Sequence, residues 1–288
     1  MIGTNRHQGD APMADVFAEF CDFSTSEPLR QGDILEAIDI NAAMWERHLM
    51  VITADCDLAF NKHHGRVTCI PLLTAEEYLL EMVVPRVRNR LVEKPVGELL
   101  KILDRIGGPR VSAERLRHWT TEESADSIIQ ALKLLEKDAV IARAAIESIQ
   151  QLDASADELN QALRNLVDGQ LGGDKPPTRK NAVARVLDPV REAYQRPPGD
   201  AMFISTFAAS HDRGYFAYLR HLEQVWEPEV AIGPKHRDAK YKRISRLRDR
   251  YTHALVQRFA TVFMAIGLPH EYEEARDVYF ELMGDALK

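Results

Sequence analysis

The hydrophobic period of this chain changes twice along its length, and this change limits the possible folds more than any other feature. Residues 33–74 contain three short apolar runs typical of β-strands, whereas residues 75–196 show helical spacing throughout. Strand-like runs return between residues 201 and 225. This order predicts an α+β fold in which a small β-barrel is assembled from two separate stretches. The five predicted strands are residues 33–40, 48–53, 66–73, 201–207 and 214–225.

The same pattern divides the 288 residues into four parts. An insertion as long as the helical part is tolerated because loop-closure entropy grows only logarithmically with loop length. In the last part, apolar residues from Leu247 to Ile266 share one helical face, and Gly267-Leu268-Pro269 ends that helix. The predicted parts are an N-terminal extension (1–30), a β-barrel (31–74 plus 200–230), a helical insertion (75–199) and a basic C-terminal helical segment (231–288).

An apolar seam runs through residues 121–166 of the predicted insertion. Its members are spaced alternately four and three residues apart, which is the pattern of a helix that packs along another helix. We expect the partner helix to belong to the same chain, because a seam this short is usually satisfied within its own domain. A homodimer or a contact with another protein through this seam is the alternative. The seam contains Ile128, Leu132, Leu135, Ala139, Ala142, Ile146 and Ile149, and Leu159, Leu163 and Leu166 continue it.

Composition places the chain among ordinary globular proteins. Hydrophobic residues make up 45% and charged residues 28%, which excludes a disordered chain and a collagen-like fibre. The odd count of three cysteines excludes a disulfide framework, and the polar start of the chain does not resemble a secretory leader. No segment approaches the roughly 18 consecutive apolar residues that span a bilayer. We therefore expect a soluble, cytoplasmic protein without membrane contacts.

Short motifs in the predicted strands follow one another in the order of a known family. Residues 31–35 (QGDIL), 47–55 (RHLMVITAD) and 67–74 (VTCIPLLT) resemble the first three strands of the MazF/PemK toxin family. Residues 214–225 and 244–247 resemble a later strand and the entry to the terminal helix of that family. The resemblance implies an SH3-like barrel and metal-independent cleavage of RNA, with no metal and no other cofactor.

The resemblance also implies a catalytic pair. Arg47 and Thr74 stand at the positions that carry cleavage in that family, where a guanidinium can neutralise phosphate charge and a hydroxyl can donate to a phosphate oxygen. The structural alternative is that Arg47 is a loop residue and that Thr74 caps a helix starting at Ala75. Two features depart from the family: His48 replaces a proline, and residues 41–46 lack a glycine-rich segment.

A cluster of metal-ligand residue types follows the second predicted strand. Asp55, Cys56 and Asp57 are followed by His63-His64 and by Cys69, but the spacing lacks the close cysteine pairs of zinc sites. We expect a hairpin that places Cys56 opposite Cys69 as a buried thiol pair. Metal binding and thiol chemistry are the alternatives, and the sequence predicts no metal site.

A basic run between residues 235 and 258 is the strongest charge feature. It holds nine basic residues against two acidic ones in a chain of net charge −7, and Tyr241 and Tyr251 lie among them. Such a patch favours a phosphate backbone, and its aromatic rings can stack on unpaired bases. A solvated face or a surface for an acidic protein is the alternative. The predicted nucleic-acid ligands are Lys240, Lys242, Arg243, Arg246, Arg248 and Arg250.

Two functions of different classes fit these observations. The first is a MazF-like protein that binds RNA or other single-stranded nucleic acid and cleaves RNA. The second is a non-catalytic module that binds a protein partner in a multi-component system. The segments TADCDLA (53–59) and RFATVF (258–263) also resemble uncharacterised proteins of bacterial anti-phage defence clusters, which suggests a defence or toxin–antitoxin setting for either function.

Overall fold

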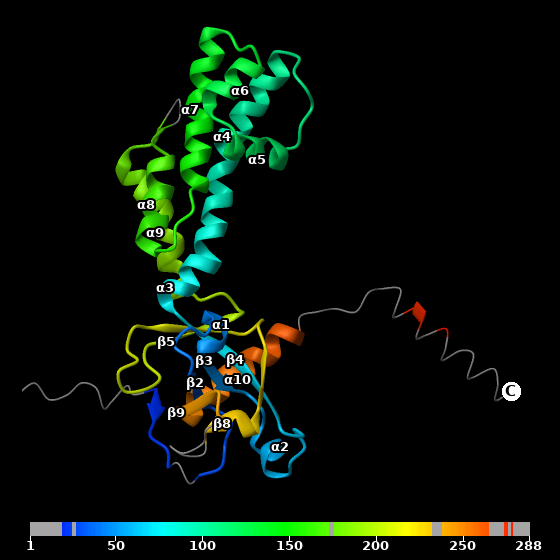
Figure 1. The fold of residues 1–288 in the computed structure, drawn as a ribbon, viewed down its shortest axis with the longest axis vertical. Coiled ribbons are helices and arrows are strands. Elements are labelled where there is room, and N and C mark those ends of the chain that lie inside the picture. Colours follow the sequence, from blue (N-terminus) through cyan, green and yellow to red (C-terminus); the bar gives the residue numbers. More distant parts are fainter. Residues whose placement is uncertain are drawn as a thin grey trace, which may run out of the picture.

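The computed structural model describes residues 19–24, 27–172, 176–231, 238–264 and the positions 274, 275 and 278. It has a mixed α+β architecture in which a curled, mainly antiparallel half-barrel sheet lies below a bundle of helices (Figure 1). The predicted α+β class is therefore confirmed. No helix in the described part is long and apolar enough to cross a bilayer.

One sheet collects strands from three distant parts of the chain. Its path runs β1-β9-β2-β3-β4-β6-β5, with β7 paired to β4 and β8 paired to β9. All of these pairs are antiparallel except β8 with β9. The strands are β1 (Phe20–Cys21), β2 (Asp33–Ala37), β3 (His48–Val51), β4 (Arg66–Thr74), β5 (Ala201–Ile204), β6 (Tyr215–Tyr218), β7 (Glu223–Trp226), β8 (Val230–Ala231) and β9 (Tyr241–Leu247).

The sheet buries apolar side chains on both faces because successive residues of a strand point in opposite directions. Ile34 and Met50 pack on one face with Leu255 of helix α10 (Asp249–Met264), whereas Leu35 and Leu49 pack on the other. All four residues of β3 are buried, as the continuous apolar run predicts. Full burial of such a side chain contributes about 1.5–3 kcal/mol, so these two apolar layers stabilise the sheet.

Strand β4 connects the two stretches of the predicted barrel. Its first half pairs with β7 and its second half with β6. The single strand predicted over residues 214–225 is therefore wrong, because the chain leaves the sheet at Leu219 and returns at Glu223. This interruption lets the segment reach both ends of the nine-residue strand β4.

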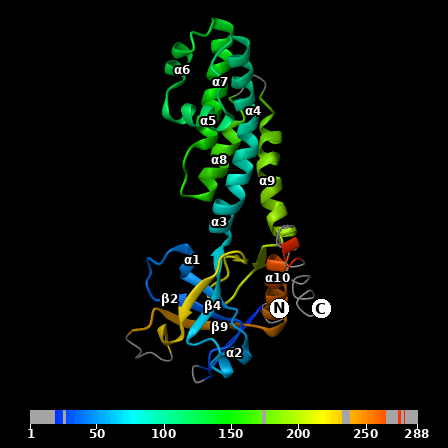
Figure 2. The ribbon, with the colours of Figure 1, turned by 90° about the vertical axis from the view of Figure 1, so that its right-hand side faces the viewer.

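The helical part rises from the end of β4 and returns to β5 (Figures 1 and 2). Tyr78, in the first helical turn after β4, stacks on Phe216 of the sheet with ring centroids 4.1 Å apart, which joins the helical core to the sheet. The elements are α3 (Ala75–Tyr78), a π-helical turn (Leu79–Val83), α4 (Val84–Arg105), α5 (Ala113–Glu122), α6 (Ala125–Ala131), α7 (Glu136–Asp153), α8 (Leu159–Gly169) and α9 (Arg179–Gln195). Shorter helices elsewhere are α1 (Met44–Arg47), α2 (Asp55–Ala59) and a 3-10 turn (Glu227–Glu229).

The predicted apolar seam is interrupted between α6 and α7, and its members on α7 are buried within the chain. Lys133 has φ of +50° and separates α6 from α7, so the expected continuous helix is wrong there. Leu135, a predicted seam member, is 79% exposed. Ala142, Ile146 and Ile149 are fully buried, on a helix that packs against α4. The intramolecular alternative is confirmed for these residues, which are not available to a second subunit.

Two segments that were predicted to lie outside the barrel contribute strands to the sheet. Residues 20–21 of the predicted N-terminal extension pair with β9 as strand β1. The predicted basic helical segment contributes β9 before α10 begins at Asp249. The charged side chains of β9 resemble those of an exposed helix in the sequence. In the structure they pair with carboxylates on the neighbouring strand β2. The predicted end of the last helix at Gly267 lies outside the described residues.

Candidate active site

Two histidines and a glutamate converge at one end of the sheet. The Nε2 atom of His48 lies 3.6 Å from Oε1 of Glu36, and Nε2 of His211 lies 3.4 Å from the same oxygen. One ligand atom from each of the three side chains lies within 4.8 Å of the other two. His48 is 7% exposed, and the side chains of Glu36 and His211 are about one-fifth exposed, so solvent reaches the cluster.

Strand register places Glu36 in this cluster. Glu36 of β2 is the register partner of His48 on β3 and of Lys242 on β9. Glu36 shares a sheet face with Ile34, and His48 shares a face with Met50, so both lie at the edge of the core that α10 covers. Lys242 Nζ lies 2.5 Å from Oε2 of Glu36, which leaves Oε1 to face the two imidazoles.

The third member comes from the turn between β5 and β6. His211 forms an isolated bridge with Ala208, and Ser210 between them has φ of +68°. Phe207 is fully buried and supports both imidazoles, with ring centroids 5.2 Å from His48 and 5.0 Å from His211. The ring of Phe207 therefore contacts both imidazoles and helps to set their spacing.

The charges of the cluster differ from those of free side chains. Burial lowers the pKa of His48, and the nearby His211 and Arg47 lower it further against the opposing effect of Glu36. Burial alone would raise the pKa of Glu36, but the hydrogen bond and positive charge of Lys242 hold that pKa below its usual value. At neutral pH an ionised carboxylate therefore faces a neutral His48 imidazole.

The structure brings Arg47 and Thr74 together through Glu77. Arg47 Nη1 lies 2.6 Å from Oε1 of Glu77, and the Thr74 hydroxyl donates to Oε2 of the same carboxylate at 2.9 Å. Thr74 also accepts from the Glu77 backbone N–H while Glu77 accepts from that of Thr74, which forms a capping box at the start of α3. The capping alternative for Thr74 is confirmed, and the catalytic role of either residue stays a prediction.

The predicted nucleic-acid ligands are mostly engaged within the chain. Arg243 and Arg246 are nearly buried and both pair with the fully buried carboxylate of Asp33, at 3.0 Å and 2.6 Å. Their other N–H groups donate to Ser24, Glu27 and Pro28, so these two side chains do not form an exposed phosphate-binding surface. Binding of nucleic acid by the basic run stays a prediction, without these two side chains as exposed ligands.

The other four predicted ligands lie nearer the surface. Lys240 pairs with Glu229, and Lys242 pairs with Glu36 of the cluster. Arg248 donates to the carbonyl of Phe20, and the Arg250 guanidinium lies over the ring of Tyr251. The positions 235 and 237 of the basic run lie outside the described residues.

The predicted pairing of Cys56 with Cys69 is wrong. Cys56 is exposed in the short helix α2, whereas Cys69 is buried in β4 opposite Val51. Burial raises the pKa of the Cys69 thiol far above its usual value, which makes it chemically inert. Asp55 accepts from the backbone N–H of Gln31 at 2.7 Å and therefore holds the chain that leads into β2.

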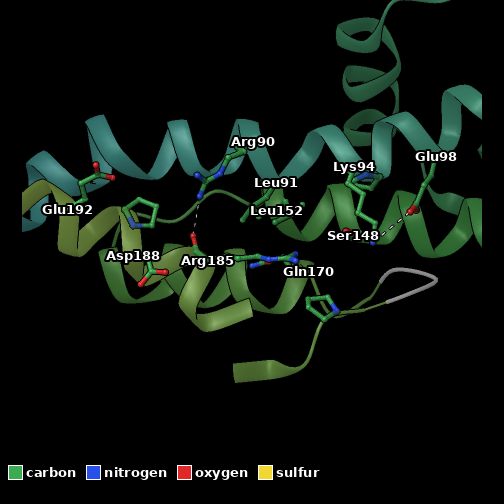
Figure 3. A pocket seen from close by; sticks show the side chains of 13 residues that line it. Arg90, Leu91, Lys94, Glu98, Ser148, Leu152, Gln170, Arg185, Asp188 and Glu192 are labelled. Carbon is green, nitrogen blue, oxygen red and sulfur yellow. Dashed lines mark hydrogen bonds and ion pairs between the residues drawn. The ribbon is translucent and has the colours of Figure 1, made fainter. Parts of the chain in front are cut away.

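A separate groove of about 520 Å³ opens between helices α4, α7 and α9 (Figure 3). Its walls carry both charge signs, including Arg90, Lys94 and Glu192, and Arg90 donates to the carbonyl of Arg185 across it. None of its lining residues belongs to the histidine cluster. Mixed charge without a convergent set of reactive groups makes this groove a weaker candidate than the cluster.

Sequence reasoning missed Glu36 and His211 and noted His48 only as a departure from the family. A lone histidine in a turn and a glutamate in a strand carry no motif. The alternation in residues 33–37 and 48–51 could have placed Glu36 and His48 on the same face, but not opposite each other.

Comparison with protein-family models, curated proteins and solved structures finds no match for this chain.

Proposed function

We propose that this protein is a MazF-like nucleic-acid-acting protein that cleaves RNA without a metal ion, with His48 and His211 as the proton-transfer pair. The supporting observation is the convergence of two imidazoles on one carboxylate at a solvent-accessible sheet end. The proposal includes an SH3-like barrel built from the half-barrel sheet and a helical insertion over residues 75–199. It also includes a bacterial defence or toxin–antitoxin setting, which an antitoxin-like neighbouring gene would support.

The proposed reaction needs one base and one acid. Nε2 of neutral His48 takes the proton of a ribose 2′-hydroxyl, whose oxygen then attacks the adjacent phosphorus. The P–O bond to the 5′-oxygen breaks, and that oxygen receives a proton from Nε2 of His211. The products are a 2′,3′-cyclic phosphate and a free 5′-hydroxyl, and solvent returns the two histidines to their starting states.

Positive groups beside the cluster suit the charge that develops on phosphate. Arg47 directly precedes His48, and the Arg47 side chain is 39% exposed. Its guanidinium can therefore leave Glu77 and bind a phosphate oxygen instead. Lys242 is 54% exposed and already compensates Glu36. In this proposal Arg47 stabilises charge, as the family resemblance implies, whereas Thr74 serves as a helix cap.

The test is cleavage of a broad set of single-stranded RNAs by full-length protein in EDTA. We expect cleavage by the wild type and a loss of about 100-fold or more in His48→Asn and in His211→Asn, because each removes one proton-transfer group. His118→Asn is the matched control, since His118 is an exposed histidine on α5. RNA left intact by the wild type would contradict the proposal.

One observation favours the second candidate, a non-catalytic module that binds a protein partner. The burial of Arg243 and Arg246 removes two cations from the expected phosphate surface. In addition, Leu135 and Val140 near the start of α7 are 79% and 65% exposed. Intact RNA together with a stable complex that Leu135→Ser disrupts would support this candidate.

A further inference from the structure

We propose that Glu36, His48 and His211 bind a single divalent transition-metal ion of the zinc class through Oε1 and the two Nε2 atoms. Two imidazole nitrogens and one carboxylate oxygen are the donor set of many zinc sites that keep a fourth position open. Imidazole ligands also favour zinc over magnesium or calcium, which prefer sites made of oxygen alone. This inference goes beyond the proposed function and does not depend on RNA cleavage.

The separations of the donor atoms suit such an ion. Bonds of about 2.0–2.1 Å in a tetrahedral site place ligand atoms roughly 3.3 Å apart. The two distances from Glu36 to the histidines, 3.6 Å and 3.4 Å, are already close to this value. One ring nitrogen of each histidine lies within 4.8 Å of the other, so at most a small shift of His211 brings the three donors to this spacing. His211 lies in a turn rather than in a strand, so this adjustment needs no change in the sheet.

The hydrogen bond at Nδ1 of His211 directs Nε2 towards the cluster. Nδ1 of His211 lies 3.2 Å from the carbonyl oxygen of Ala209, and a carbonyl oxygen only accepts hydrogen bonds, so Nδ1 carries the proton. In the neutral ring the Nε2 lone pair then faces Oε1 of Glu36, another acceptor, at 3.4 Å. Either a proton, which makes His211 a cation paired with Glu36, or a bound metal ion satisfies both atoms. A hydrogen bond from the second ring nitrogen to a carbonyl is also what orients histidine ligands in metal sites.

Lys242 limits the strength of this site. Its ammonium group occupies Oε2 of Glu36 and directs Oε1 towards the histidines, but it also brings a positive charge near the bound ion. We therefore expect weaker binding than in structural sites made of several thiolates, and tighter binding in Lys242→Met. An increase in zinc affinity is specific to the proposed site, because removal of a surface lysine far from these three ligands does not strengthen zinc binding through them.

The experiment measures metal binding directly in full-length protein stripped with EDTA and transferred to metal-free buffer. Zn²⁺ titration by calorimetry gives the stoichiometry, and Co²⁺ substitution gives visible absorption bands that report histidine and carboxylate ligation. We expect one ion per chain, and an affinity about tenfold or more lower in His211→Asn and Glu36→Gln. His211 is about one-fifth exposed in the connection between β5 and β6, and a melting curve of His211→Asn that matches the wild type shows that the fold is intact.

Two control variants separate this site from other zinc ligands on the surface. His118→Asn and Cys56→Ser should each bind zinc as the wild type does, because His118 and exposed Cys56 lie outside the cluster. Full zinc binding by His211→Asn, or loss of binding in Cys56→Ser, would overturn the inference. Cleavage in EDTA is a separate measurement, so either proposal can fail alone. If both hold, zinc inhibits cleavage, because a metal-bound imidazole nitrogen does not transfer a proton.

Discussion

Glu36 and His48 are register partners on adjacent antiparallel strands, and Oε1 of Glu36 lies 3.6 Å from Nε2 of His48. The sheet itself therefore fixes one half of the candidate site, while a turn supplies His211 as the other half. The four predictions that follow test the scaffold and the assignments around this pair.

Arg246 should be a stabilising residue rather than a ligand of RNA. Arg246→Ala leaves the buried carboxylate of Asp33 with Arg243 as its remaining ion-pair partner, and we expect a loss of about 3 kcal/mol in the free energy of unfolding. Urea denaturation measures this loss. Arg248→Ala is the control, with a change of about 0.5 kcal/mol or less because Arg248 makes one exposed contact. Equal stability of both variants would contradict the structural role of Arg246.

Thr74 should act on stability and not on cleavage. Thr74→Ala removes the capping box of α3, and we expect a loss of about 1 kcal/mol with unchanged cleavage by the folded protein. Thr74→Ser should restore the stability because serine keeps the hydroxyl. Thr178→Ala, which removes the cap of α9, is a matched control with a similar loss. A large fall in cleavage by stable Thr74→Ala would instead support the family's catalytic role for this residue.

Ile146 should stabilise the monomer through its contact with α4. Ile146→Ala should lower the free energy of unfolding by about 2–5 kcal/mol, because the side chain is fully buried among the helices. Val140→Ala on the exposed side of α7 should change it by about 0.5 kcal/mol or less. Light scattering on both folded variants should give the oligomeric state of the wild type. A change of that state in Ile146→Ala alone would show that the seam joins subunits.

The His63–Glu227 pair should make stability depend on pH. The His63 ring donates hydrogen bonds to the carboxylate of Glu227 and to the carbonyl oxygen of Asp57, and these bonds raise the pKa of His63 above its usual 6.5. A raised folded-state pKa stabilises the fold fully below the unfolded value, and this contribution disappears as the pH rises through the folded-state pKa. The difference in melting temperature between wild type and Glu227→Gln should therefore be present at acidic pH and shrink at alkaline pH.

Glu229→Gln provides the control for this pH dependence. Glu229 forms its ion pair with a lysine, Lys240, rather than with a histidine, so the effect of Glu229→Gln on the melting temperature should be constant across the same range. A difference in melting temperature between wild type and Glu227→Gln that grows with pH would contradict the assigned His63–Glu227 pair.

Local patterns predicted those parts of the fold that depend on neighbouring residues in the sequence. The apolar run at His48–Val51 is a buried strand, and residues 75–196 are mainly helical, as their spacing indicates. Strand β9 was missed because Lys242 and Arg246 obscure its alternation, and their carboxylate partners are more than 200 residues away. The left-handed backbone at Lys133, which breaks the seam, has no glycine to mark it.

The candidate site could be predicted only in part for the same physical reason. Arg47 and Thr74 were placed side by side by motif order, and both do contact Glu77. The histidine cluster instead depends on the register of β2 against β3 and on the path of a turn between β5 and β6. Neither the pairing of residues 36 and 48 nor the position of residue 211 follows from hydrophobic periodicity.

The most direct test of the central claim, that His48 and His211 form one reactive centre, is a double-mutant cycle on RNA cleavage in EDTA. Groups that act in one step are strongly non-additive, so His48→Asn, His211→Asn and the double variant should lose cleavage to a similar extent, about 100-fold or more. Wild-type cleavage that survives in all three variants, or no cleavage by the wild type, would contradict it.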